Sequence, residues 1–433
     1  MVDRPKNIGI KALEVYFPKT YISQDKLEDR DLEILGEDKR QSIKGKYTQG
    51  LGQINLAFCT DHEDTVSIAM NAITQLFDKY NFTPDMFGRL EVGTESSIDR
   101  SKSIKSFLLQ LFGDNHELFG VDNTNACYGG TAAFLNSLAW IESSQWDGRM
   151  ALVVCSDIAV YEDMSARPTG GCGAVAFAIG PNAPLVVEPH FATYCAHGYD
   201  FYKPRPTNPH PLVDAPLTIT LYYECLDECF QKFRTLPNKQ LSVDDYDYIC
   251  FHTPFINHIK KCTGRLLMMK DLQNKDPLIQ QSRNNRALVS EWSNKAKPLF
   301  SQKVDPSCTL SKNTGNGYTA SLYLAIASLI DSTSLSIGQR ILCFSYGSGA
   351  CATMYEIRVN DDCSFMKEKL DLQNRLQSRI EKTVYEYEKA IKKENQRFMS
   401  APYQPSDSLD LLWDKVWYLD HVDEQWRRFY LRK

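Results

Sequence analysis

The sequence of 433 residues lacks several features that would place a protein in a class at once. No apolar run approaches the length that spans a membrane, and the first residues, MVDRPKNIGIKAL, contain neither an apolar signal core nor an Arg- and Ser-rich amphipathic stretch. We therefore expect no membrane partner and a cytoplasmic location. No basic run is long enough to follow a phosphate backbone and the formal net charge is −5, so we expect no nucleic-acid partner.

Zinc-type cysteine spacings are also missing, although the chain has 13 cysteines. The cysteines form no C-x-x-C pair, and most lie inside apolar stretches such as ALVVCSD and RILCFSY. This pattern is typical of reduced core residues in a cytosolic protein, and it predicts no metal site.

The sequence does contain apolar residues in the spacings typical of helices and buried strands. Residues 64–80 have apolar side chains at helical spacing behind an Asp-Thr pair that can cap a helix. Residues 150–160 and 173–180 are short continuous apolar runs typical of buried strands. Helices that alternate with such strands predict the α/β class. With 43% hydrophobic residues, the chain can bury a large core, in two or three domains or in one large duplicated fold.

A weak internal repeat favours the duplicated fold. CYGGTAAFLNSLAWI (127–141) resembles GNGYTASLYLAIASLI (315–330), and Thr131 of the first copy corresponds to Thr319 of the second. Each copy is followed by an apolar strand, a glycine-containing turn and a second strand. The repeat therefore predicts two related halves with a site between them.

The boundaries of these halves can be placed along the chain. We expect an N-terminal half over residues 1–185 and a C-terminal half over residues 186–433. The stretch 270–298 is polar with helical spacing, which predicts a peripheral excursion. Residues 364–400 are charged and amphipathic, and the aromatic C-terminal end is expected to pack back as short strands.

A thiol, a carboxylate and an imidazole stand in settings that suit catalysis. Cys127 comes just before a predicted helix, whose N-terminus is expected to lower the pKa of the thiol and make it a nucleophile. Glu95 follows the apolar start of EVGTE, and His252 ends the strand-like YDYICFH. Each residue taken alone also fits a structural role: a buried cysteine, a solvated carboxylate or a hydrogen-bonded histidine.

Several motifs together resemble one family, the eukaryotic 3-hydroxy-3-methylglutaryl-CoA synthases. The resemblance runs in order from about residue 7 to the C-terminus, and the motifs that carry it are GKYTQGLGQ, GRLEVGTESSIDRSKS, NACYGGTAAFLNSLAWIESSQWDGR, ARPTGGCGAVAFAIGPNAPL, YDFYKP, FHTPF, TGNGYTAS, FSYGSG and WYLDHVDEQWRRFY. The resemblance implies a thiolase-like five-layered αβαβα fold made of two related halves, usually a homodimer. It implies condensation of acetyl-CoA with acetoacetyl-CoA and water, without a metal or a bound cofactor, as a step in the supply of isoprenoid and sterol precursors.

The resemblance also assigns roles to residues. It makes Cys127 the acylated nucleophile, Glu95 the general acid and base, and His252 the residue that binds and polarises acetoacetyl-CoA. Asp157 and Asp200 lie in matching motifs and are expected to support the site. The positions that match acyl-CoA contacts are Lys44, Gly45, Lys46, Ser165, Thr169, Thr218, Lys261, Asn316 and Ser348.

The chain departs from the family pattern at positions around the expected CoA contacts, which puts CoA affinity in question but not the reaction type. The residues that differ from those usual in the family are Ile43, Lys44, Ser165, Asn257 and Gly317. Two alternative functions remain open from the residues. One is another thiolase-superfamily condensing enzyme, such as a ketoacyl synthase, which pairs its cysteine with His/His or His/Asn sets and lacks the equivalent of Glu95. The other is a catalytically weak paralogue kept for binding or regulation.

Overall fold

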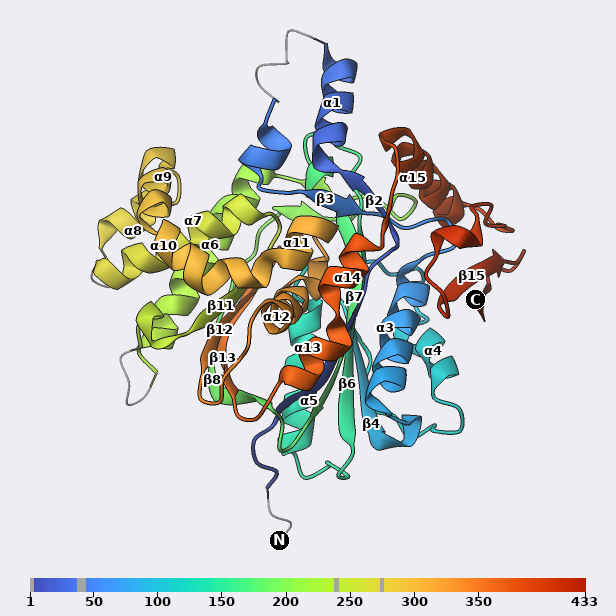
Figure 1. The fold of residues 1–433 in the computed structure, drawn as a ribbon, viewed down its shortest axis with the longest axis horizontal. Coiled ribbons are helices and arrows are strands. Elements are labelled where there is room, and N and C mark those ends of the chain that lie inside the picture. The colour runs from blue at the N-terminus through green and yellow to red at the C-terminus, as the bar shows by residue number, and fades with distance from the viewer. Residues whose placement is uncertain (1–3, 37–43, 237–240, 273–275) are drawn as a thin grey trace.

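The computed structural model describes residues 4–36, 44–236, 241–272 and 276–433, so the departure at Ile43 lies outside the described residues. A nine-stranded mixed sheet passes through the molecule (Figure 1). In the order in which they lie side by side, its strands are β11 (Tyr248–Phe251), β12 (Arg340–Gly347), β13 (Cys351–Val359), β8 (Leu185–Cys195), β1 (Gly9–Tyr16), β7 (Gly171–Gly180), β6 (Met150–Ala159), β4 (Phe87–Gly93) and β5 (Asp122–Asn123).

The sheet repeats itself on the two sides of the β1–β8 junction. β4 pairs in parallel with β6, which is antiparallel to β7, and β11 pairs in parallel with β12, which is antiparallel to β13. The junction consists of only two residue pairs, Gly9 with Val186 and Ile10 with Leu185. The α/β class and the two related halves predicted from the repeat are therefore confirmed; the exact boundary between the halves stays a prediction.

Helices cover both faces of each half of the sheet. The two helices of the sequence repeat, α5 (Gly129–Glu142) and α12 (Ser321–Ser332), lie in the middle and share one apolar core with strands of both halves (Figure 1). A second core lies beneath α6 (Ala215–Arg234) and α7 (Ile256–Asp271), and a third beneath α3 (Thr65–Tyr80). The sequence of layers is therefore helix, sheet, helix, sheet, helix, as expected.

Local sequence explains the elements that frame the site. Asp64 caps α3 in a capping box: its side chain accepts a hydrogen bond from the Ser67 N–H, and the Asp64 N–H donates to the Ser67 hydroxyl oxygen. β6 and β7 are buried along almost their whole length, which explains why both read as continuous apolar runs without alternation. The ring of Phe177 in β7 stacks on Tyr323 in α12 with 4.5 Å between centroids, so the central helices are held by aromatic packing.

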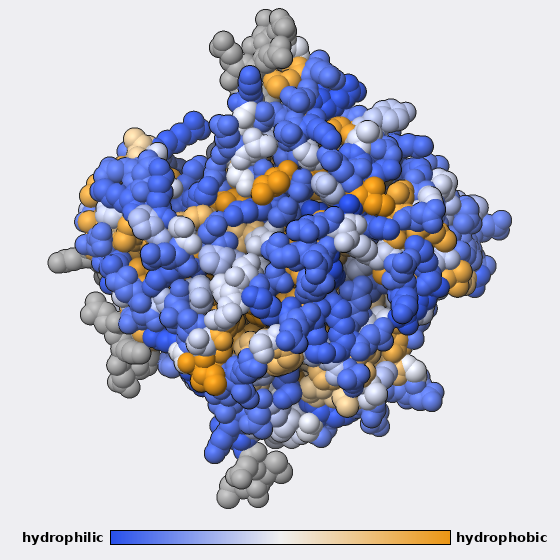
Figure 2. Space-filling view, viewed as in Figure 1, coloured by the Kyte–Doolittle hydropathy of each residue, from blue (hydrophilic) through white to orange (hydrophobic). Residues whose placement is uncertain are grey.

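The remaining elements surround this frame. The polar stretch contains the short helices α8 (Pro277–Ser282) and α9 (Arg286–Lys295), which lie on the outside of α7 (Figure 1). The aromatic C-terminus forms a hairpin of β15 (Trp417–Val422) and β16 (Arg428–Arg432). The face shown in Figure 2 is mostly polar, with small separate apolar patches. In the described part of the chain, none of the helices combines the length and apolar character that crossing a membrane requires. The bounds of these outer elements are β2 (Thr20–Ser23), α1 (Gln24–Leu35), β3 (Asn55–Ala57), α4 (Ile104–Leu108), β9 (Phe201–Tyr202), β10 (Leu212–Val213), α8 (Pro277–Ser282), α9 (Arg286–Lys295), α10 (Lys297–Leu299), α11 (Thr309–Thr314), α13 (Ser364–Leu370), α14 (Leu372–Gln377), β14 (Ile380–Glu381), α15 (Val384–Met399), β15 (Trp417–Val422) and β16 (Arg428–Arg432).

Candidate active site

The candidate site lies where the carboxyl end of β4 meets the N-terminus of α5. The end of β11 is connected to it through Tyr222, whose hydroxyl donates to the His252 carbonyl and whose pKa is raised by burial and also by the Cys127 thiol. Glu95 stands two residues after β4, and His252 directly follows β11. Cys127 stands two residues before α5. The related positions of β4 and β11 in the two halves explain how residues from distant parts of the sequence reach one place.

Cys127 occupies a turn that holds its backbone in an unusual conformation. Its φ is 57°, in the left-handed region that a non-glycine residue rarely adopts. Its backbone N–H donates to Oε2 of Glu95 over 2.5 Å. A Cβ on Gly130 would lie 2.4 Å from the carbonyl oxygen of Thr319, so glycine is required there for α5 to approach the start of α12.

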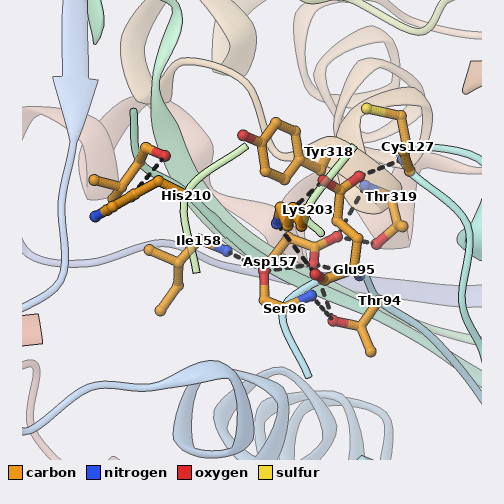
Figure 3. A network of polar contacts seen from close by, with 12 residues as sticks. Thr94, Glu95, Ser96, Cys127, Asp157, Ile158, Lys203, His210, Tyr318 and Thr319 are labelled. Carbon is orange, nitrogen blue, oxygen red and sulfur yellow. Dashed lines mark hydrogen bonds and ion pairs between the residues drawn. The ribbon is translucent and has the colours of Figure 1, made fainter. Parts of the chain in front are cut away.

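The carboxylate of Glu95 lies between Cys127 and Lys203 (Figure 3). The Glu95 side chain is only 5% exposed, and Lys203 Nζ is 3.3 Å from its Oε1. Burial raises the pKa of Glu95 to about 7, although the Lys203 cation acts in the opposite direction. Near neutral pH, Glu95 can therefore both accept and return a proton.

The pKa predicted for Cys127 is wrong. The thiol was expected to be acidic, but burial raises its pKa well above the ordinary value, and the carboxylates of Glu95 and Asp157 add to the increase. These effects outweigh the favourable helix N-terminus, because negative charge close to a half-buried sulfur disfavours the thiolate. The free protein therefore carries a thiol at this position.

Asp157 is the centre of the hydrogen-bond network in Figure 3. Its Oδ1 accepts from the Thr94 hydroxyl at 2.9 Å, the Glu95 N–H at 2.8 Å and the Ser96 hydroxyl at 2.8 Å. Its Oδ2 accepts from the Thr319 N–H at 3.0 Å and from the Thr319 hydroxyl. Asp157 thus fixes the backbone of Glu95 and connects it to the opposite half of the molecule.

His252 is buried and uncharged. Burial lowers the pKa of its imidazole to about 3. The Tyr222 hydroxyl donates to the His252 carbonyl over 2.6 Å, and the two rings are roughly parallel with 6.3 Å between centroids. Nδ1 of His252 has no hydrogen-bond partner in the described part of the chain. The Tyr222 bond therefore fixes the backbone of His252, and the buried Nδ1 is left with unused hydrogen-bonding capacity.

Asp200 organises the turn that contains Ser348. Its carboxylate accepts from the Tyr346 hydroxyl at 2.9 Å and from the Gly349 N–H at 2.9 Å. The Thr218 hydroxyl at the start of α6 donates to the same carboxylate over 3.1 Å. Three of the expected site residues, Asp200, Thr218 and Ser348, are therefore brought together at one turn.

Two family models together match nearly the whole chain. Residues 4–184 match the family model Hydroxymethylglutaryl-coenzyme A synthase N terminal, and residues 185–433 match Hydroxymethylglutaryl-coenzyme A synthase C terminal. The chain belongs to the hydroxymethylglutaryl-coenzyme A synthase family. The resemblance noted from the motifs is thus confirmed.

Relatives match this synthase over nearly its whole length. The chain is similar to hydroxymethylglutaryl-CoA synthase of Saccharomyces cerevisiae, with 39% identity over 99% of this chain and 90% of the relative. It is 40% identical to the human hydroxymethylglutaryl-CoA synthase named cytoplasmic, over 99% of this chain and 88% of the relative. The solved structure of MvaS in complex with 3-hydroxy-3-methylglutaryl coenzyme A has a TM-score of 0.84 and 29% identity, and the match covers 98% of this chain and 99% of that one.

A groove beside the site contains two of the expected CoA contacts of the synthase. It has a volume of about 860 Å³ and runs between α6, α7 and α9. Lys46, Lys261 and Arg286 line it, together with Arg283, whose charge is already paired with Glu224, Asp227 and Glu228. These cations suit the phosphates of a CoA ligand.

Asn257, one of the residues that depart from the family pattern, holds the segment that contains Gln49 and Gly50. Asn257 stands where the synthases usually have a lysine, and its side-chain amide donates to the carbonyls of Gln49 at 2.6 Å and Gly50 at 2.8 Å. In the same segment, the Gly45 N–H donates to the carboxylate of Glu28. The φ of Gly45 is 78°, a backbone conformation that favours glycine. The Asn257 side chain therefore holds the backbone of Gln49 and Gly50.

The other expected contacts make local hydrogen bonds. The Thr169 hydroxyl donates to the Ala166 carbonyl at 2.7 Å, and the Asn316 side-chain oxygen accepts from the Tyr318 N–H at 2.9 Å. Ser165 and Lys44 are exposed. The roles of these four residues in CoA binding stay predictions.

Lys203 is the main site residue that sequence reasoning missed. It lies inside the motif YDFYKP, where only Asp200 was singled out. Besides its ion pair with Glu95, its Nζ donates to the Glu95 carbonyl at 3.1 Å and lies 5.1 Å from the ring centre of Tyr318. A lysine is normally a solvated surface charge, so nothing in the sequence pattern predicted that this one would meet a buried carboxylate.

Proposed function

We propose that the chain condenses acetyl-CoA with acetoacetyl-CoA and water to form (S)-3-hydroxy-3-methylglutaryl-CoA and CoA. The observation that carries the proposal is the contact between the Cys127 backbone and the buried Glu95 carboxylate, 2.5 Å long. The contact supports the proposal because it brings together the residue we propose as acyl acceptor, Cys127, and the residue we propose as proton acceptor, Glu95, as this reaction needs. Two further facts support the proposal: the relatives bear the name of this activity, and the MvaS structure contains the product.

The first step is transfer of the acetyl group to Cys127. The sulfur attacks the carbonyl carbon of acetyl-CoA, the bond from that carbon to the CoA sulfur breaks, and the departing CoA takes up the proton that Cys127 loses. One thioester replaces another, so the methyl group of the bound acetyl remains acidic enough to lose a proton.

The second step forms the new carbon–carbon bond. The Glu95 carboxylate takes a proton from the acetyl methyl group, and the resulting carbanion attacks the ketone carbon of acetoacetyl-CoA. The ketone oxygen becomes an alkoxide and then a hydroxyl as it takes up a proton. A neutral His252 can donate a hydrogen bond to this oxygen, which stabilises the developing charge.

The third step is hydrolysis. Water adds to the thioester that joins the product to Cys127, which gives the free carboxylate of the product and regenerates the thiol. Glu95 can accept a proton from the attacking water, since its pKa of about 7 makes the carboxylate available near neutral pH.

We infer a wider setting from the family. The groove containing Lys46 and Lys261 would bind the CoA moiety, and the chain would act as a cytoplasmic homodimer in the mevalonate pathway that supplies isoprenoid and sterol precursors. The human relative named cytoplasmic supports the location. No bound cofactor or metal is needed for the three steps.

The test is a direct assay with the purified chain. Acetyl-CoA and acetoacetyl-CoA should together cause loss of the acetoacetyl enolate absorbance, and acetyl-CoA alone should acetylate Cys127, as mapped by mass spectrometry after digestion. The Cys127→Ala variant should fold and show neither signal. Acetylation elsewhere would overturn the assigned nucleophile, and turnover only with a malonyl thioester would favour a ketoacyl synthase.

A further inference from the structure

Two cysteines face each other at the ends of adjacent antiparallel strands. Cys195 is the last residue of β8 and Cys351 is the first residue of β13, and the two are register partners. Neither belongs to the catalytic steps described above.

The hydrogen-bond pattern defines how close these residues lie. The next pair outward, Ala196 and Ala350, exchanges both backbone hydrogen bonds. Because bonded and non-bonded pairs alternate in an antiparallel ladder, Cys195 and Cys351 form a non-hydrogen-bonded pair, whose Cα atoms are typically about 4.5 Å apart. That separation is within the range of about 4.4–6.8 Å that a disulfide bridges.

The side chains are also in contact and accessible. Burial raises the pKa of the Cys351 thiol to about 11, and a hydrogen bond with Cys195 adds to the increase. Of the 13 cysteines, ten are buried. The remaining three are Cys127, the half-buried Cys351 and the exposed Cys195. Apart from the nucleophile, the solvent-accessible thiols of this chain are therefore the two that face each other.

The pair lies beside the candidate active site. Two residues after Cys351 on β13, the Thr353 hydroxyl is 2.6 Å from the hydroxyl of Tyr128, the neighbour of Cys127 in the chain. Cys351 also follows the turn of Ser348 and Gly349 that Asp200 fixes. A covalent bond between Cys195 and Cys351 would therefore tie that turn to the end of β8.

We propose that Cys195 and Cys351 form a dithiol modification site that hydrogen peroxide converts to a disulfide. The exposed sulfur of Cys195 attacks one oxygen of the peroxide, the O–O bond breaks, and the products are a sulfenic acid and one water. The Cys351 sulfur then attacks the Cys195 sulfur, a second water leaves, and the S–S bond forms. In total, two thiols are oxidised and one peroxide is reduced to two waters, and an added dithiol reverses the change by exchange.

The chain offers a matched internal control. Cys250 and Cys343 are also register partners, in β11 and β12, but both are fully buried. Peroxide should leave them as thiols, because oxidation follows access to solvent.

The experiment uses the Cys127→Ala chain, so that the nucleophile does not react. After treatment with a small excess of hydrogen peroxide, peptide mapping without reduction should find Cys195 joined to Cys351, and dithiothreitol should release the two peptides. Cys250 and Cys343 should remain free. No cross-link at the dose that oxidises a free thiol peptide, or a cross-link between other cysteines, would overturn the proposal.

A second measurement does not depend on oxidation. Phenylarsine oxide binds two thiols that lie next to each other, so it should bind the Cys127→Ala chain once. Binding should be lost when either Cys195→Ser or Cys351→Ser is added, with circular dichroism to check that each variant folds. Arsenical binding that survives both substitutions would show that the two thiols are not the site.

Discussion

The ammonium group of Lys203 lies 3.3 Å from the carboxylate of Glu95, which also accepts a hydrogen bond from the Cys127 N–H. Burial and Asp157 both raise the pKa of Glu95, while Lys203 lowers it. The resulting pKa of about 7 is therefore a balance in which burial and Asp157 raise the pKa, and Lys203 and the Cys127 N–H lower it.

Replacing Lys203 should shift the pH dependence of condensation. Glu95 must be ionised to take a proton from the acetyl group, so the rate should rise as the pH increases through about 7. Lys203→Met removes the cation that favours ionisation, and the rising limb should move up by about one pH unit. The measurement is kcat against pH. Lys203→Arg should keep the limb near its original position; an unchanged limb in Lys203→Met would show that the ion pair has no such role.

Removing the Glu95 carboxylate should separate acyl loading from condensation. Glu95→Ala should still form acetyl-Cys127 but reduce overall turnover by at least about 100-fold, since the proton acceptor is lost. Because Glu95 helps to raise the pKa of the Cys127 thiol, the variant should also react faster with iodoacetamide at pH 7.5.

His252→Ala provides the comparison for that experiment. It should also load acetyl, but it should mainly weaken the use of acetoacetyl-CoA, seen as a higher KM for this substrate. If both variants lose the same half-reaction to the same extent, Glu95 and His252 do not have the separate roles assigned to them.

The glycine at the start of α5 should be intolerant of any side chain. A Cβ at Gly130 would lie 2.4 Å from the Thr319 carbonyl and 2.6 Å from the Cys155 sulfur, both in the packed interior. Gly130→Ala should therefore lower the free energy of unfolding by about 2 kcal/mol, measured by chemical denaturation. Gly50→Ala is the control, because a Cβ there meets nothing closer than 3.6 Å. Equal stability of the two variants would mean that α5 can shift without cost.

The lysines at the groove should act on affinity through charge. Lys261→Ala should raise the KM for acetyl-CoA roughly fivefold at low salt, and the effect should fade at high ionic strength. Lys44 is expected to supply part of the charge that Asn257 lacks, so Lys44→Ala should raise KM and Asn257→Lys should restore it. If Lys44→Ala leaves KM unchanged at low salt, Lys44 does not compensate.

Much of this fold could be predicted because its signals are local. The cap at Asp64, the apolar strand over residues 150–160 and the repeated loop-helix-strand order each depend on neighbouring residues, and each is present in the structure. The positions of Glu95, Cys127 and His252 at element ends were also readable from breaks in apolar runs.

The electrostatics of the site could not be predicted in the same way. The pKa of Cys127 depends on how deeply the sulfur is buried and on Glu95 and Asp157, 32 and 30 residues away along the chain. The sequence pattern predicts where a helix begins, but it does not predict which distant carboxylates the fold brings close to the sulfur. The same reason explains why Lys203 was overlooked.

Two threonines, one from each half, donate hydrogen bonds to residues of the other half. Thr319, before α12, donates to Asp157 in β6, and Thr131 in α5 donates to Ser345 in β12 over 2.7 Å. The backbone of Glu95 is therefore held by Asp157, a residue of its own half, which is in turn held by Thr319 of the other half. The position of the Glu95 carboxylate should therefore depend on correct packing of one half against the other, so a variant that loosens this packing should disturb Glu95 without touching it.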